Sequence, residues 1–229
     1  VDRVNLALGA SAAAVLGGDL GVSGRSDIPD EFATEAQRRG LRSTRMVSFP
    51  SVLFHGEASQ MATIKAVGDG YPLRGQLLVA DGPAVLWVGA QDVISGAMSA
   101  GTLGQFVLYA LIGAGAPPPG QAYADPRLLD ALGLKLGEDL EFGAGTLKVT
   151  RVLRTEPDAS DGLLQMSPPL LVNRADVDAA GLLGPGSRAA YRLMFAGDAA
   201  AIEELRQWLQ PRSGEYRLVT LDNAQRGVR

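Results

Sequence analysis

The residue types that carry most enzyme and metal chemistry are scarce in this chain. There is no cysteine, and the one histidine, His55, stands beside Gly56 between two β-rich runs, where an exposed hairpin turn is expected. A zinc site usually recruits several Cys or His ligands, so no zinc site is expected. The loop 68–72, GDGYP, lacks the further acids of a calcium-binding loop. We therefore predict no metal site.

Catalytic and nucleotide-binding motifs are also missing. No serine lies in a GxSxG turn, and no GxxxxGK[ST] phosphate loop occurs. The glycine-rich run 113–120, GAGAPPPG, places prolines where a phosphate cradle needs backbone N–H groups. Glu203 and Glu204 share a predicted helix with Arg206, which is typical of a solvated face. We predict no catalytic residue and no cofactor, and a binding or mechanical role instead.

Aromatic side chains remain as the candidates for contact with a partner or with apolar cargo. Such residues are more often core residues than ligand contacts, so the structural interpretation stays open beside the functional one. The candidate contact residues are Phe49, Phe54, Tyr71, Trp87, Phe106 and Tyr109.

The composition is that of a globular protein that does not bind nucleic acid. Of the 229 residues, 46% are apolar, which is enough to build a core of one large or two small domains. The formal net charge is −4, whereas binding to phosphate backbones needs a basic surface.

One segment differs from the rest in composition. Residues 81–124 contain only two charged side chains, Asp81 and Asp92, and the tract 93–115 contains none. Its length suits a membrane span, but its five glycines disfavour a long helix. Ser99 or Thr102 could instead begin a shorter core helix ending near Ile112. Three alternatives stay open for the tract: a packed element, a membrane- or detergent-associated helix, and a disordered loop.

Periodicity and turn residues predict α+β elements at both ends of the chain. The first eighty residues predict helix 1–16, strand 19–23, a helix within 26–40, and a hairpin whose strands flank 55–58. Asp125, Asn173 and Asp198 are predicted to begin helices, and 143–145 to join two strands. The fold class is α+β, with a mixed-sheet layer built from both chain ends. We expect 1–75 plus 163–229 to form this layer and 76–162 to form an inserted, small β-rich subdomain.

Several segments, in order, resemble one family. They are LGGDLGVSG (16–24), MVSFPSVLF (46–54), IKAVGDGYPLRGQL (64–77), LLDALGLKLGEDLEFG (128–143), RTEPD (154–158) and GSRAAYRLMFAGD (186–198). Together they resemble the extracytoplasmic domain, or periplasmic core domain, of FtsX-like, MacB-type ABC transporter permeases, in the YbbP-like branch. The resemblance covers most of 1–80 and 117–229, and it implies that the mixed-sheet layer from both chain ends is porter-like, with a small β unit inserted in it.

This resemblance implies a non-enzymatic domain at the periplasmic face of the bacterial inner membrane. The implied partners are a second permease copy or pseudo-symmetric half, a cytoplasmic ATPase reached through transmembrane helices outside this sequence, and a periplasmic lipase-like protein. The implied role is to couple ATPase-driven stalk movement to the extraction or export of lipids or hydrophobic compounds.

Residues 83–115 depart from that family. They resemble instead a transmembrane segment of an MsbA-like ABC exporter, around SGAMSAGTLGQFVLYA. A recombined or designed chimera without an evolved function is therefore one alternative. A soluble small-molecule binding domain is another, and it would need a pocket with converging polar groups.

Overall fold

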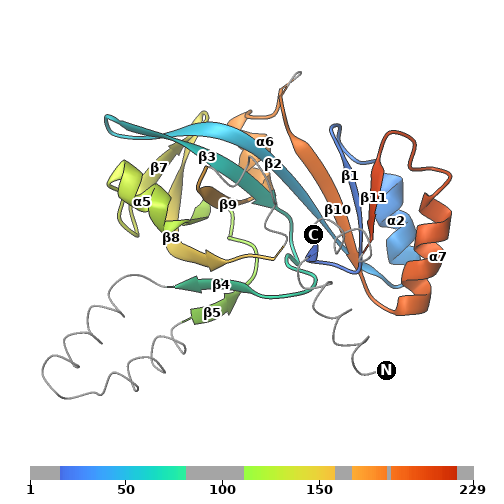
Figure 1. Cartoon of the computed structure of the whole chain (residues 1–229). Helices are drawn as coiled ribbons and strands as arrows, with labels where there is room; N and C mark the ends of the chain where they lie inside the picture. The colour runs from blue at the N-terminus through green and yellow to red at the C-terminus, as the bar shows by residue number, and fades with distance from the viewer. Residues whose placement is uncertain (1–15, 81–110, 158–166, 185–186, 221–229) are drawn as a thin grey trace, which may run out of the picture.

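The computed structural model describes residues 16–80, 111–157, 167–184 and 187–220, which form eleven strands and four helices (Figure 1). The strands are β1 (Leu20–Gly24), β2 (Arg42–His55), β3 (Ala58–Val67), β4 (Leu77–Ala80), β5 (Leu111–Ala114), β6 (Gln121–Ala124), β7 (Asp139–Phe142), β8 (Gly145–Thr155), β9 (Pro169–Asn173), β10 (Ala190–Ala196) and β11 (Arg217–Thr220). The helices are α2 (Asp30–Arg38), α5 (Pro126–Leu132), α6 (Arg174–Ala180) and α7 (Ala199–Leu209).

All eleven strands belong to one mixed sheet. Their order is β11-β1-β10-β2-β3-β9-β6-β8-β4-β5, with β7 beside both β2 and β8. The pairs β3–β9 and β6–β8 are parallel, and the other pairs are antiparallel. Strands from both chain ends, β1, β10 and β11, lie side by side. The predicted α+β class, with a mixed sheet built from both ends, is confirmed.

Part of this sheet closes on itself. The strands β2, β3, β9, β6, β8 and β7 each pair with the next, and β7 returns to β2 at the pair Phe54–Glu141. One large apolar cluster fills the ring, with side chains such as Phe49, Ile64 and Phe142 pointing inward. Leu128 of α5 and Val177 of α6 join the same cluster. Because strand residues alternate between faces, the neighbours of these inward residues face outward.

The other end of the sheet is covered by two helices. α2 and α7 lie side by side over β1, β10 and β11, at the right of Figure 1. Phe32 of α2 is 1% exposed, and its ring meets Trp208 and Tyr216 edge to face. The side chains under these two helices form a second apolar cluster. A third cluster, around Tyr71 and Met194, lies on the opposite face of the sheet. The long strand β2 contributes to two of the clusters and runs from the helix-covered end into the ring.

The helix ends are set by local sequence. Asp125, Asn173 and Asp198 each accept a hydrogen bond from a backbone N–H of the first helical turn, as predicted. Gly133 and Gly181 adopt φ of +60° and +65° after α5 and α6, a conformation that favours glycine. These caps fix where each helix meets the strand before or after it.

The described end of the apolar tract is a strand. Residues Leu111–Ala114 form β5, an edge strand paired antiparallel with β4, so the alternative of a short core helix ending near Ile112 does not hold for these residues. Strand pairing with Leu77–Ala80 overrides the local helical spacing. Residues 81–110, and residues 1–15 of the predicted helix 1–16, lie outside the described residues. The division into 1–75 plus 163–229 and an inserted 76–162 stays a prediction.

Candidate interaction site

The structure separates the predicted aromatic contact residues. Phe49 is 4% exposed inside the strand ring, and Tyr71 is 1% exposed in the cluster on the opposite face. Phe54, by contrast, is 46% exposed on the outside of β2. The remaining candidates, Trp87, Phe106 and Tyr109, lie outside the described residues. A contact role for these six residues therefore stays a prediction, and Phe54 is the described one whose ring faces solvent.

Phe54 has two apolar neighbours that the sequence did not single out. Val52, Phe54 and Met61 are 46%, 46% and 53% exposed, the large apolar side chains that stand out at the surface of the described part. Val52 and Met61 are direct cross-strand partners, and Phe54 lies two residues further along the same face. We call these three residues the apolar ridge. The alternation of Phe49, Ser51 and Leu53 inward with Val52 and Phe54 outward was a usable signal for it.

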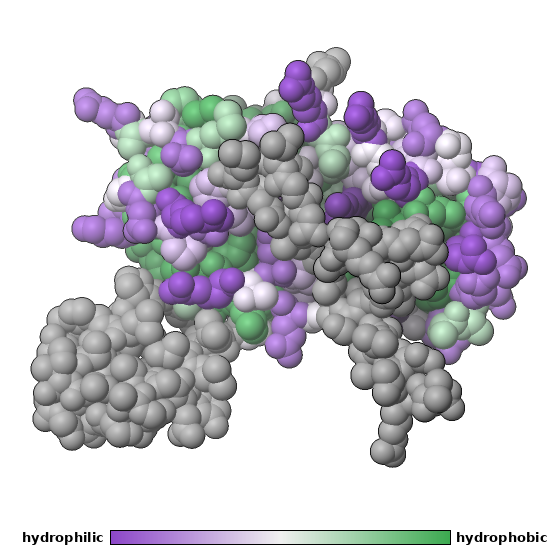
Figure 2. All heavy atoms as spheres, viewed as in Figure 1, coloured by the Kyte–Doolittle hydropathy of each residue, from purple (hydrophilic) through white to green (hydrophobic). Residues whose placement is uncertain are grey.

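Two carboxylates flank the apolar ridge. Glu141 is the register partner of Phe54 and alternates with the buried Leu140 and Phe142, so it faces outward beside the phenyl ring. Glu57 lies in the exposed turn between β2 and β3. We call Glu57 and Glu141 the acidic rim. In Figure 2, apolar atoms lie at the surface over the end of this hairpin, at the upper left, among hydrophilic ones.

His55 closes β2 next to the ridge. Its Nδ1 lies 3.2 Å from the Leu132 carbonyl oxygen, so Nδ1–H donates there, and its Nε2 lies 3.8 Å from Glu138. The side chain is 30% exposed, so it is half-buried rather than an exposed turn residue. Over the described ranges, no group of His, Asp and Glu side chains is placed to hold a metal ion.

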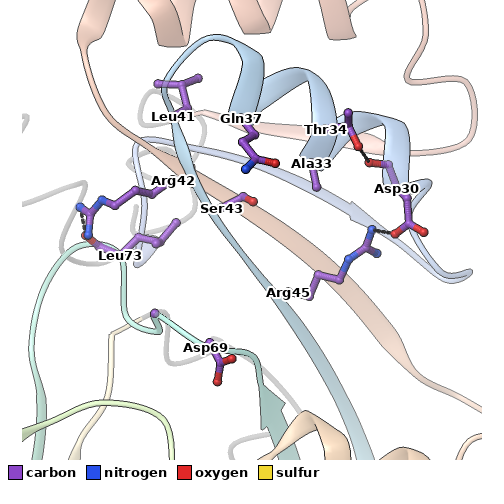
Figure 3. A pocket seen from close by; sticks show the side chains of 11 residues that line it. Asp30, Ala33, Thr34, Gln37, Leu41, Arg42, Ser43, Arg45, Asp69 and Leu73 are labelled. Carbon is purple, nitrogen blue, oxygen red and sulfur yellow. Dashed lines mark hydrogen bonds and ion pairs between the residues drawn. The ribbon is translucent and has the colours of Figure 1, made fainter.

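An open hollow of about 800 Å³ lies between α2 and the loop that follows β3 (Figure 3). Arg45 points into it but already donates to Asp30 at 2.5 Å, Asp27 at 3.3 Å and the Ile28 carbonyl at 2.7 Å. Arg42 donates to the Leu73 carbonyl at 3.3 Å. Arg45 is thus paired with carboxylates of this chain, and the carboxylates of Asp30 and Asp69 also line the hollow.

A polar clamp joins three distant segments near the start of β1. The Arg74 guanidinium donates to both Asp19 carboxylate oxygens, at 2.8 to 3.1 Å, and to the Gly197 carbonyl at 3.3 Å. The Gly197 N–H in turn donates to Asp19 at 3.0 Å. The hydrogen bond and charge of Asp19 raise the pKa of Arg74 above its already high value. The clamp ties the entry to β1, the loop before β4 and the end of β10 into one unit.

The strands next to this clamp come from the two ends of the described chain. β1 and β11 pair antiparallel, with Leu20 opposite Thr220. The start of the first described strand and the end of the last one therefore lie side by side at one end of the sheet. Across the described ranges, no helix combines the length and apolarity needed to cross a bilayer.

No protein-family model matches the chain. In sequence it is 29% identical over 210 residues to the uncharacterized ABC transporter permease YbbP of Escherichia coli strain K12. That alignment covers 92% of this chain but 22% of YbbP, so the chain spans about a fifth of that relative's length.

Two solved structures align along most of the chain. The periplasmic region of MacB from Actinobacillus actinomycetemcomitans aligns with a TM-score of 0.53 at 13% identity, over 94% of this chain and 95% of that one. The extracellular domain of YknZ, a noncanonic ABC-type transporter from Gram-positive bacteria, aligns with a TM-score of 0.49 at 12% identity, over 88% and 100%. The MacB match shows the fold, and it extends over nearly all of both chains. With the sequence similarity to YbbP, it confirms the predicted resemblance to the periplasmic domains of FtsX-like, MacB-type permeases.

Proposed function

We propose that this chain is the force-transmitting periplasmic domain of an ABC transporter permease, located at the outer face of the bacterial inner membrane. The observation that carries the proposal is the MacB-like fold over 94% of the chain, together with sequence similarity to a permease over 92% of it. The domain itself performs no chemistry and couples stalk movement to the transfer of lipids or hydrophobic compounds.

The sheet provides a physical route for such movement. Because Leu20 and Thr220 are register partners, a displacement of the segments leading to either strand acts on both. The clamp of Asp19, Arg74 and Gly197 passes it to the loop before β4 and to β10. β2 is hydrogen-bonded to β10 over seven register pairs and continues to the hairpin turn, so movement at one end of the sheet reaches the other.

The proposed partners follow from the same role. A cytoplasmic ATPase would drive the movement through transmembrane helices of the complete permease. A second permease copy or a pseudo-symmetric half would provide the opposing surface, and a periplasmic lipase-like protein or the cargo would receive the motion. In the proposal, hydrolysis of ATP belongs to the ATPase subunit alone.

The clamp gives a direct test of coupling. The test uses the complete permease reconstituted with its ATPase. We expect Arg74→Ala to lower ATP-dependent transfer of a fluorescent phospholipid about fivefold or more while ATP hydrolysis continues. The reason is that the ATPase still hydrolyses ATP, but its movement is transmitted less well through the domain. Transfer to acceptor vesicles and phosphate release are measured on the same proteoliposomes.

The matched control is Arg127→Ala. Arg127 also donates two hydrogen bonds to one aspartate, Asp125, and its pKa is raised by that partner, but it lies on the surface of α5 away from β1. Transfer by this variant should equal that of the wild type. Equal loss in both variants would contradict the clamp as the route. Failure of the wild-type complex to move either the phospholipid or a hydrophobic dye would contradict the transport role itself.

A further inference from the structure

We propose that the apolar ridge and the acidic rim form a docking surface for a protein segment that is amphipathic and basic, with apolar side chains flanked by Lys or Arg. The proposal names the chemistry of the partner surface, and it rests on the proposed function only for the role of that partner. It is carried by four observations on the β2–β3 hairpin.

The first observation is the reach of the hairpin. The pairing of β10 with β2 ends at Ser48, and the pairing of β9 with β3 begins at Thr63. Beyond these points β2 and β3 pair with each other. Among the described strands, the one other pairing of this part of the hairpin is between β2 and β7, at Phe54 and Glu141. Figure 1 shows the hairpin extending past its neighbours at the upper left. A partner can therefore approach this part of the sheet without displacing a strand of the described fold.

The second observation is the composition of the outward face. Phe and Met are residue types favoured in the buried centres of protein interfaces, and the flexible thioether of Met adapts to irregular partner surfaces. Val52, Phe54 and Met61 are adjacent on one face, so a single apolar side of a partner segment could cover all three. The gain from removing this apolar surface from water favours association.

The third observation is the charge around the ridge. Within the described residues, neither carboxylate of the acidic rim has a hydrogen-bonding or ion-pair partner, and both residues are exposed. On the same outer face, the cation Lys148 is 3.3 Å from Asp139. The rim therefore presents negative charge to an approaching surface. A basic partner is attracted, whereas a second copy of this hairpin or an anionic lipid surface brings like charges together.

The fourth observation concerns the edge of β2. Between the last register pair with β10, at Ser48, and the pair with β7, at Phe54, this edge faces no strand in the described part. Pro50 stands in that interval, and its ring leaves the backbone without an N–H to donate. Proline on an open edge disfavours addition of a foreign strand. Docking therefore goes through side chains, which suits an amphipathic helix.

The test uses the chain with four defined probes: a 16-residue amphipathic peptide of Leu and Lys, the same peptide with Glu in place of Lys, phosphatidylglycerol vesicles, and the chain itself at rising concentration. We expect binding of the Leu/Lys peptide, and no binding of the Leu/Glu peptide or the vesicles. Both Phe54→Ser/Met61→Ser and Glu57→Lys/Glu141→Lys should weaken the peptide affinity about tenfold. Isothermal titration calorimetry measures the affinity.

Matched variants separate the surface from general effects. Glu31→Lys/Glu204→Lys makes the same change in net charge on α2 and α7, at the other end of the sheet, and should leave the affinity within about twofold. Phe54→Leu/Met61→Leu keeps the ridge apolar and should retain binding. All changed side chains are exposed or at the surface, so circular dichroism should show every variant folded.

Three results would overturn the proposal. One is equal affinity of the peptide for the wild type and for both ridge and rim variants. Another is stronger binding to the vesicles than to the peptide, which would make the ridge a lipid contact. The third is a concentration-dependent dimer that Phe54→Ser/Met61→Ser abolishes, which would make it a contact between copies. None of these results bears on the clamp experiment, so the docking surface can fail while the proposed transport function stands.

Discussion

Lys65 is a cation in the interior of the sheet, and it ties two distant segments together. The residue is 6% exposed on β3, and its Nζ lies 3.1 Å from Glu156 and 3.2 Å from the Pro157 carbonyl. The Tyr71 hydroxyl donates to the same carbonyl at 3.2 Å. The segment after β8 is therefore held against β3 by a buried ion pair and shared hydrogen bonds.

We expect Lys65→Met to lower the free energy of unfolding by about 3–5 kcal/mol, because it removes the ammonium group of a buried ion pair together with its hydrogen bonds to Glu156 and the Pro157 carbonyl. Urea unfolding followed by circular dichroism measures the difference. The control is Lys148→Met, which removes the cation of an exposed pair and should cost less than about 1 kcal/mol. If both variants lose the same free energy of unfolding, the buried ion pair contributes no more to stability than the exposed one.

At the scale of elements, the turn between β7 and β8 is packed against α6. Gly143 has φ of +58°, and a Cβ atom there would lie 2.8 Å from the Ala180 carbonyl oxygen and 3.0 Å from the Leu182 side chain. Gly56, in the β2–β3 turn, has nearly the same φ, +59°, but open space around it. Both hairpin turns thus need a residue with positive φ, but only the turn at Gly143 is closely packed against other atoms.

We expect Gly56→Ala to cost about 1–2 kcal/mol for its left-handed backbone alone. Gly143→Ala should cost about 1–3 kcal/mol more, because the added methyl group also pushes the turn away from α6. Chemical unfolding of the two variants gives the difference directly. If both cost the same, the turn does not pack tightly on α6, and the closure of the strand ring at β7 would be looser than the contacts indicate.

The elements that sequence could predict are those with local signals. Asp125, Asn173 and Asp198 cap helices because each side chain satisfies N–H groups two or three residues ahead, a short-range interaction visible in the sequence. The strands β4 and β6 were not predicted, since four residues are too few for a period of two to stand out. β5 lies in a tract whose spacing indicated a helix, and pairing with β4 decided otherwise.

The same limit applies to the candidate site. Alternation along β2 separates Phe49 from Phe54 by face, yet it does not say which face other elements will cover. That depends on where β10 and β9 stop beside the hairpin, which is set by long-range pairing. Met61 was therefore not foreseen as part of a surface with Phe54. The clamp was likewise invisible, because Asp19, Arg74 and Gly197 meet only after the sheet has formed.

At the scale of the whole molecule, the apolar tract poses the question of what belongs to the domain. β5 is the last strand of the sheet order and pairs with β4 at four register positions. Just after it, the Ala116 N–H donates to the Tyr71 carbonyl at 3.1 Å. The end of the tract, from Leu111 onward, is thus part of the fold.

We expect a chain in which a short Gly-Ser loop replaces residues 84–110 to unfold cooperatively with a melting temperature close to that of the wild type. Replacing residues 84–115 instead removes β5 and weakens the hydrogen bond from the Ala116 N–H to the Tyr71 carbonyl. The melting temperature should therefore fall by about 5 °C or more. Thermal unfolding followed by circular dichroism compares the two deletions. If the shorter deletion loses its cooperative transition, residues 84–110 form part of the core, and the tract cannot be an addition to an otherwise complete domain. If the longer deletion melts with the wild type, β5 contributes nothing to the sheet, and the domain boundary then lies at β4.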